Sequence, residues 1–258
     1  IQPLSGRISF KEAGPQGLPT AVKARAYDLP DLRNYDIASC HTVGLRQLAD
    51  NLSEVGVDVD TTPLDNYLAK GGKDWACEEL ALPRKLVKMV EHGPKYLMSL
   101  PTSFDHARAM TDGHPRRLDL VKEIQDEYPD LDVDETLSRL RELFLPLREM
   151  AEEMAEALLD EYWGAHKKPA GPAGWAMENA AGVLFRPSDW EEGHERKSKV
   201  IAWYLQGLEA AYVHHITILS QDYDYEAIAN EHDGLITRGA VPQEPMDEAR
   251  QRSGFTRA

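Results

Sequence analysis

The sequence predicts an α+β fold in which a mostly helical subdomain is inserted between two pieces of an antiparallel sheet. Three observations predict it. A short β-favouring segment lies at residues 33–37, apolar residues recur at helical spacing through the middle of the chain, and residues 227–237 resemble a tight hairpin with a polar tip. With 258 residues, of which 42% are apolar, the chain is long enough to bury a sizeable core.

The first sheet piece precedes the helical block. Residues 1–33 are rich in Gly, Pro and mixed polar residues, which predicts loops and edge strands. Residues 33–37 predict a strand that delivers Asp36 to its end. A helix is expected directly afterwards, from the spacing of Val43, Leu45, Leu48 and Leu52.

The middle of the chain predicts helices. Residues 75–91 have helical periodicity, with Pro83 as a first-turn residue that restarts the helix and Gly93-Pro94 as its end. A longer helix is expected to begin in the N-cap region 134–136, with a kink or break at Pro146.

The second sheet piece follows a turn-rich linker at residues 168–172. A change of period predicts a hairpin over residues 174–186, and a largely apolar stretch predicts a buried helix over residues 195–219. The hairpin at residues 227–237 comes next. From Pro242 onward the chain is polar, which predicts a loosely ordered end.

Charge and cysteine content limit the classes of protein. With 29 basic and 44 acidic residues, the formal net charge is −15, so contact with nucleic acid would be local. Cys40 and Cys77 are too few for a disulfide framework or a cysteine-rich zinc site. We expect two reduced, partly buried thiols, with a single bridge as the alternative.

The compartment predicted by the sequence is the cytoplasm. No apolar run approaches the roughly 20 residues of a membrane span, and the N-terminus lacks the layout of a secretory signal. We therefore expect no membrane contact. The first residue is Ile1 rather than Met, which leaves open whether the chain is a piece of a longer protein.

Two aspartates stand where predicted strands end, Asp36 and Asp233. Nucleotidyl transfer by two metal ions needs a pair of carboxylates on adjacent strand ends, so that the ions lie about 4 Å apart. Each aspartate alone is more typical of a turn or a cap. Their distance in sequence fits residues that only the fold brings together.

A basic helix face lies between the two aspartates. Arg84 and Lys88 are one helical turn apart, with Lys85 beside them and Tyr96 eight residues after Lys88. Such a face can hold a triphosphate, because each cation can bind a phosphate oxygen. The same spacing is common on solvated helices.

In order along the chain, these pieces resemble the palm and fingers of the family A DNA polymerases and of the related single-subunit phage-type RNA polymerases. The segment Ser5-Gly6-Arg7 is similar to the Thr-Gly-Arg segment that precedes the palm. Residues 35–41 are similar to motif A. Motif B is an Arg, a Lys four residues later and a Tyr eight residues after that, which Arg84, Lys88 and Tyr96 match.

The resemblance continues to the end of the chain. Residues 205–211, which include Gln206, look like the buried Gln-Gly helix that reaches the primer-template minor groove in family A enzymes. His232-Asp233 is similar to motif C. The resemblance therefore implies an antiparallel-sheet palm at residues 1–60 and 169–258, with helical fingers inserted at residues 61–168.

The resemblance also implies roles for the site residues. Asp36 and Asp233 would bind two Mg²⁺ ions, for which Mn²⁺ is a substitute. Lys88 would contact the phosphates and protonate pyrophosphate, and Arg84 would clamp the γ-phosphate. The remaining matches would contact the nucleotide (His41, His92 and Tyr96) or the nucleic acid (Arg7, Gln206 and His232).

The partners implied are template, primer and nucleoside triphosphates, with a thumb supplied by an upstream domain or a separate subunit. Four positions depart from the family pattern. His41 stands where DNA polymerases have a glutamate that blocks a ribose 2′-hydroxyl, and His92 stands where an aromatic residue is expected. Leu97 replaces the glycine after the motif B tyrosine, and Gly234 replaces an acidic residue. A single-subunit RNA polymerase or a primase-like enzyme is thus the alternative.

Two other classes of protein remain as alternatives. A metal-dependent phosphohydrolase of the His-Asp type would use His232-Asp233 with other histidines, in an all-helical fold. A catalytically degenerate domain would only bind nucleic acid or a partner protein. The pair His214-His215 on the buried helix is more typical of packing or hydrogen bonding than of a metal site.

Overall fold

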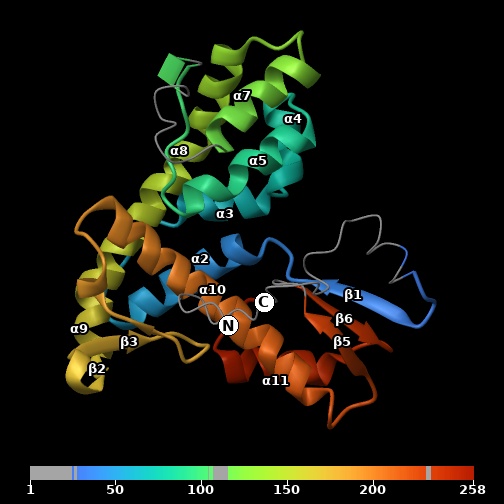
Figure 1. Ribbon diagram of the computed structural model, residues 1–258, viewed down its shortest axis with the longest axis vertical. Coiled ribbons are helices and arrows are strands. Elements are labelled where there is room, and N and C mark those ends of the chain that lie inside the picture. The colour runs from blue at the N-terminus through green and yellow to red at the C-terminus, as the bar shows by residue number, and fades with distance from the viewer. Residues whose placement is uncertain (1–24, 26–27, 104, 107–115, 231–233) are drawn as a thin grey trace.

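The computed structural model describes residue 25 and residues 28–103, 105–106, 116–230 and 234–258. Helices predominate, and two small antiparallel sheets accompany them (Figure 1). The predicted α+β class is therefore confirmed. Within these residues, no helix combines the length and the apolar character that crossing a membrane requires.

The larger sheet joins the two ends of the chain. Its strand order is β1-β6-β5, and both pairs are antiparallel. The strands are β1 (Leu32–Asp36), β5 (Glu226–Asn230) and β6 (Gly234–Arg238). Asp36 pairs with Gly234, which confirms both the predicted strand before Asp36 and the predicted hairpin near the C-terminus.

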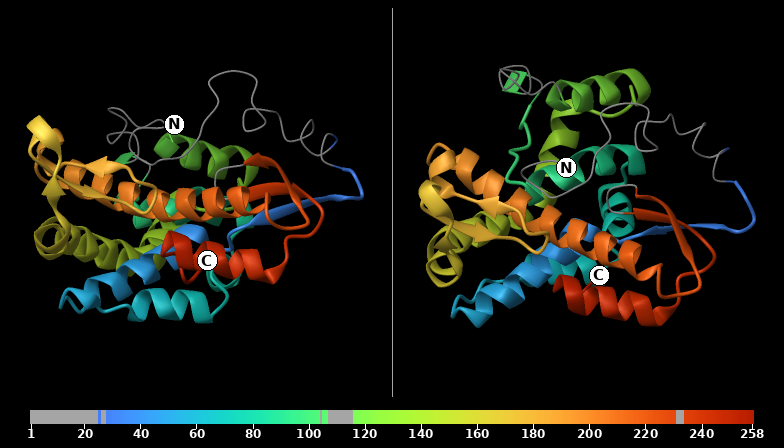
Figure 2. Two further views of the ribbon diagram at one scale, coloured as in Figure 1. Left: turned by 90° about the horizontal axis from the view of Figure 1, so that it is seen from below. Right: turned by 60° about the horizontal axis from the view of Figure 1, so that its bottom comes forward.

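Three helices pack together beside this sheet. They are α2 (Cys40–Glu54), α10 (His194–Leu219) and α11 (Gln243–Ser253). The helix α10 is buried on most faces and contacts both α2 and α11, as the two views of Figure 2 show. The helix predicted from the spacing of Val43, Leu45, Leu48 and Leu52 and the helix predicted over residues 195–219 are thus confirmed.

A second group of helices lies above the sheet in Figure 1. It comprises α3 (Thr62–Ala69), α4 (Lys73–Leu80), α5 (Arg84–Lys95), α7 (Arg116–Glu127) and part of α8 (Val133–Ala157). The long helix α8 runs from this group toward α10, which it contacts. One turn of π-helix (Leu158–Tyr162) and the short α9 (Trp163–His166) follow it.

The smaller sheet contains the predicted hairpin. Its strands are β2 (Lys168–Pro169), β3 (Trp175–Glu178) and β4 (Leu184–Phe185), in the order β2-β3-β4. Short 3₁₀ turns lie at Gly171–Ala173 and Pro187–Asp189. The linker predicted at residues 168–172 thus contributes an edge strand.

The predicted restart of the helix at Pro83 is confirmed: α4 ends at Leu80, and Pro83 is the residue before α5. The helix α5 ends at Lys95, one residue after the predicted end at Gly93-Pro94. The N-cap region predicted at residues 134–136 for the next long helix was wrong. The helix α8 begins after Asp132, whose carboxylate accepts from the Glu135 N–H at 2.8 Å, and it passes Pro146 without a break.

The C-terminal segment was predicted to be loosely ordered, and this was also wrong. The helix α11 packs on α10, and Phe255 is fully buried against Tyr212. The Thr256 hydroxyl donates to Gln47 Oε1 at 2.7 Å. Ala249 and Phe255 are fully buried although the segment is mostly polar. Their burial stabilises the packing of the segment on α10.

Candidate functional site

The end of β1 positions Asp36. The side chain is exposed, and its backbone lies opposite Gly234, the residue that follows Asp233 in the chain. Residues opposite each other in an antiparallel pair have Cα atoms about 4.5–5.5 Å apart. Asp233 and His232 lie outside the described residues, and so does Arg7. The sheet register therefore places Asp36 opposite Gly234, which is the sequence neighbour of Asp233.

The helix α5 has two contrasting faces. One face is buried and includes Leu86, Val87 and Val90. The other face carries Arg84, Lys88 and His92, which are exposed and lie one turn apart from one another. The predicted basic face is thus present. Arg84 forms an exposed ion pair with Asp74, whereas Lys88 makes no ion pair with any residue that the structure describes.

The end of α5 fixes the position of Tyr96. Leu97 adopts the left-handed conformation (φ 64°) and is fully buried. The Met98 N–H donates to the Gly93 carbonyl at 2.9 Å and the Leu97 N–H donates to the Pro94 carbonyl at 3.0 Å, which closes the helix by a Schellman motif. Leu97 stands where motif B of the polymerases has a glycine. It thus adopts the conformation that glycine favours.

His41 connects α2 with the end of α5. It lies in the first turn of α2, after a sharp corner at Ser39 (φ 51°). Its Nδ1 lies 3.5 Å from His92 Nδ1, and its ring centroid lies 5.2 Å from that of Tyr96. His41 is therefore a neighbour of His92 and Tyr96, which lie about fifty residues further along the chain and were also predicted to contact the nucleotide.

Glu209 is a site residue that the sequence did not single out. It lies on α10, it is fully buried, and its Oε2 is 3.1 Å from His41 Nε2 and 3.8 Å from Cys40 Sγ. Burying a carboxylate is costly unless it is paired. A glutamate within the largely apolar stretch 200–213 was the available signal.

His92 is neutral at pH 7. Removal of part of its surface from water, together with the Lys95 ammonium and the neighbouring His41 ring, lowers the pKa of His92 to about 4. One of its ring nitrogens can therefore donate a hydrogen bond while the other accepts one. The exposed cations of α5 are Arg84, Lys85 and Lys88.

The buried face of α5 carries a charged network of its own. Glu91 accepts from Lys95 at 3.0 Å and from the Tyr67 hydroxyl at 2.9 Å, and it pairs with Lys73 at 2.9 Å. Burial opposes ionisation of Glu91, but the Lys95 and Lys73 ammonium groups outweigh it and hold its pKa at about 2. We call Lys73, Tyr67, Glu91 and Lys95 the buried charge network.

The Gln-Gly pair lies on α10. Gln206 is half-buried. A Cβ atom on Gly207 would come within 2.3 Å of Asn179 Nδ2, whose amide donates to the Trp203 carbonyl at 2.8 Å. Gly207 therefore permits the β3–β4 turn to pack directly on the helix.

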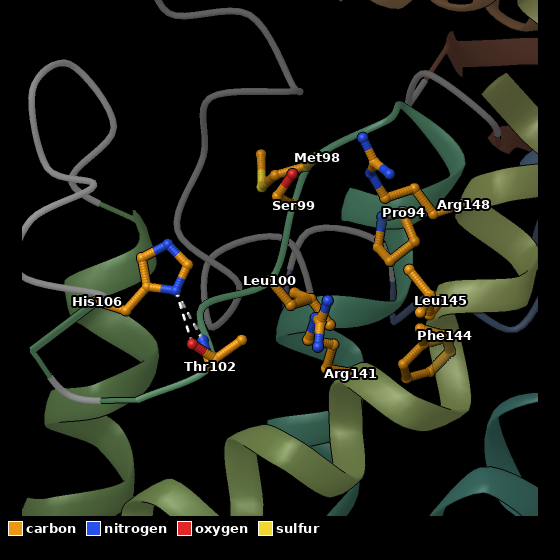
Figure 3. Close-up of a pocket in the computed structure, with 10 residues that line it drawn as sticks. All are labelled: Pro94, Met98, Ser99, Leu100, Thr102, His106, Arg141, Phe144, Leu145 and Arg148. Atoms are coloured by element: carbon orange, nitrogen blue, oxygen red, sulfur yellow. Dashed lines mark hydrogen bonds between the residues drawn. The ribbon is translucent and has the colours of Figure 1, made fainter.

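A cavity of about 240 Å³ lies where the end of α5 and the following segment meet α8. Its polar lining contains two cations, Arg141 and Arg148 from α8, beside Ser99, Thr102 and His106, whose Nδ1 accepts from the Thr102 N–H (Figure 3). The Nε of Arg148 donates to the Leu97 carbonyl at 3.2 Å, so it supports the end of α5. The cavity suits an anion better than a cation.

Comparison with known proteins adds no family to this description: neither the known protein families nor the curated proteins contain a match to the chain.

The His-Asp phosphohydrolase alternative predicted an all-helical fold, and the antiparallel sheet at Asp36 contradicts it. Cys40 and Cys77, which both lie within the described residues, are thiols and not a disulfide, as predicted.

Proposed function

We propose that this chain catalyses template-directed nucleotidyl transfer, as a DNA polymerase of the family A type, by a two-metal-ion mechanism. The pairing of Asp36 with Gly234 is the observation that carries the proposal. It brings Asp36 opposite Gly234, the residue that follows Asp233 in the sequence. Asp36 and Asp233 would there hold two Mg²⁺ ions, or Mn²⁺ in their place.

The exposed face of α5 supports triphosphate binding. Lys88 faces solvent and makes no ion pair with described residues, so a phosphate would gain a cation without displacing a partner. The ion pair of Arg84 with Asp74 is mostly exposed on both sides. Exposed pairs contribute little stability, so Arg84 can exchange Asp74 for the γ-phosphate at small cost.

His41, His92 and Tyr96 would form the wall against the sugar and base of the incoming nucleotide. Their contacts place them at the end of the same helix that carries Lys88. Tyr96 is further tied to α10, because its carbonyl accepts from the Ser198 hydroxyl at 3.0 Å. A neutral His92 contributes shape and hydrogen bonding here, while the charge on the phosphates is met by Arg84 and Lys88.

In this proposal the sheet β1-β6-β5 and α10 correspond to a palm, formed from residues 1–60 and 169–258. The helices within residues 61–168 correspond to fingers. Arg7, Gln206 and His232 would contact the primer-template duplex, and the thumb would come from an upstream domain or a separate subunit. The arginines of the cavity beside α8 add a site for a backbone phosphate.

A primer-extension assay with the purified chain tests the proposal. Four reactions would contain Mg²⁺ with dNTPs or NTPs, each with and without a primer on a single-stranded template. We expect incorporation with at least one nucleotide type, complementary to the template and abolished by EDTA. The absence of incorporation in all four reactions, with Mn²⁺ as well as Mg²⁺, would overturn the proposal.

The same samples separate the alternatives. Extension with NTPs and without a primer indicates an RNA polymerase or a primase-like enzyme. Binding of template-primer without any incorporation indicates a catalytically degenerate module that only binds nucleic acid. The binding arm is a fluorescence-anisotropy titration at two salt concentrations, because phosphate contacts weaken steeply with salt.

A further inference from the structure

We propose that Cys40, His41 and Glu209 form a binding site for Zn²⁺, distinct from the Mg²⁺ positions at Asp36. The thiol sulfur, an imidazole nitrogen and a carboxylate oxygen of these residues all lie within 4.8 Å of one another. These are the three types of protein ligand that zinc takes most often. The inference does not depend on nucleotidyl transfer.

The distances between the donor atoms fit a tetrahedral ion. His41 Nε2 lies 3.1 Å from Glu209 Oε2, and Cys40 Sγ lies 3.8 Å from the same oxygen. Zinc–ligand bonds of about 2.0–2.3 Å at tetrahedral angles would set these two separations at about 3.4 and 3.6 Å. Small rotations of the side chains would therefore bring all three donors onto one ion.

Burial adds to the fit. Cys40 is 5% exposed and Glu209 is 0% exposed, and the His41 side chain is 12% exposed. A bound Zn²⁺ would offset the cost of holding the Glu209 carboxylate inside the protein. Three protein ligands leave a fourth position for water or another donor, as in sites that exchange ligands.

The ligand types also set the selectivity. A thiolate and an imidazole favour Zn²⁺, whereas Mg²⁺ takes oxygen ligands and keeps several waters. Asp36, which lies four residues before Cys40, offers only oxygen. The two sites would therefore bind different metals from the same solution.

The position of the site suggests what the ion does. Two ligands lie in the first turn of α2, directly after the corner that leaves β1, and the third lies in the middle of α10. A bound ion would join these two helices beside the strand end. It would also fix the ring of His41 against His92 and Tyr96.

Metal binding to the full chain, without nucleotide or nucleic acid, tests the inference. The protein is stripped with a chelator and titrated with Zn²⁺ in competition with a chromophoric chelator, and with Co²⁺ as a spectroscopic probe. We expect one equivalent of Zn²⁺ and a thiolate-to-cobalt charge-transfer band. Cys40→Ser and His41→Ala should each weaken Zn²⁺ binding by at least about 100-fold, because loss of outer-shell partners alone costs 10–100-fold.

Two control variants make the result specific. Cys77→Ser removes the other thiol, which is only half-buried, and should retain the cobalt band. Asp36→Asn should retain Zn²⁺ binding, and circular dichroism should show that each variant is folded. If the wild-type protein binds no Zn²⁺ and gives no cobalt–thiolate band, or if Cys40→Ser binds as the wild type does, the proposal is wrong and the cluster is a buried hydrogen-bonded group.

Discussion

The two faces of α5 differ in how far their charged side chains are removed from water. On the buried face, Glu91 and Lys95 are almost fully removed from water and compensate each other. On the exposed face, Arg84 and Lys88 point to solvent, where a ligand can reach them. The difference shows how one helix can contribute both stability and chemistry. Variants of the two faces should therefore separate the free energy of unfolding from turnover.

The largest expected effect on stability comes from the buried face. Glu91→Gln leaves Lys95 and Lys73 without their counter-charge, so the free energy of unfolding should fall by about 3–5 kcal/mol. Urea denaturation followed by circular dichroism measures it. Glu79→Gln, on the exposed surface of α4, is the matched control and should change stability by less than about 0.5 kcal/mol. Equal effects of the two variants would contradict the role of the buried charge network.

The same carboxylate should make stability depend on pH. The pKa of Glu91 is lowered from 4.5 to about 2, so its contribution is complete above about pH 4.5 and is lost as the pH falls toward 2. The stability difference between wild type and Glu91→Gln should shrink by about 3 kcal/mol across this window. Urea denaturation at several pH values measures it. A difference that stays constant with pH would mean that Glu91 is not held ionised by its neighbours.

On the exposed face, Lys88→Ala should act on turnover. We expect the rate of nucleotide incorporation to fall by about 100-fold, because the contact with the phosphates and the proton donor for pyrophosphate are lost. The free energy of unfolding should change by less than about 0.5 kcal/mol. Lys122→Ala, an exposed lysine of α7, is the control and should keep the wild-type rate. If both variants turn over equally, Lys88 is only a solvated residue.

A smaller effect is expected where α10 meets the β3–β4 turn. Gly207→Ala puts a Cβ against the Asn179 side chain, which is held by hydrogen bonds from the Ala181 and Val183 N–H groups. The cost should be about 1–3 kcal/mol of stability, measured by thermal unfolding. Gly164→Ala has open space around its Cβ and should be neutral or slightly stabilising. A stabilising Gly207→Ala would contradict the close packing.

Much of the secondary structure followed from local patterns. The strand before Asp36, the helix with Leu45 and Leu48, and the two hairpins were predicted because apolar period and turn residues act over a few positions. The docking of Phe255 was missed, because it depends on tertiary contacts that local pattern does not contain.

The candidate site was predictable in part. Asp36, Lys88, His41, His92 and Tyr96 were chosen from spacing and resemblance, and the structure makes the last three neighbours. Glu209 was missed because its contact with His41 joins α2 to α10, which are far apart in sequence. The side-chain position of Asp233 lies outside the described residues, so its pairing with Asp36 stays a prediction.

Single-nucleotide incorporation by Asp36→Asn, compared with Asp31→Asn, tests nucleotidyl transfer at the strand end most directly. Asp36 ends β1 and Asp31 directly precedes it, and the Asp31 side chain forms an exposed ion pair with Arg238. Asp36→Asn should lose incorporation while it keeps its stability and its affinity for template-primer, and Asp31→Asn should keep all three. Incorporation by Asp36→Asn at the rate of Asp31→Asn would contradict a catalytic metal at Asp36.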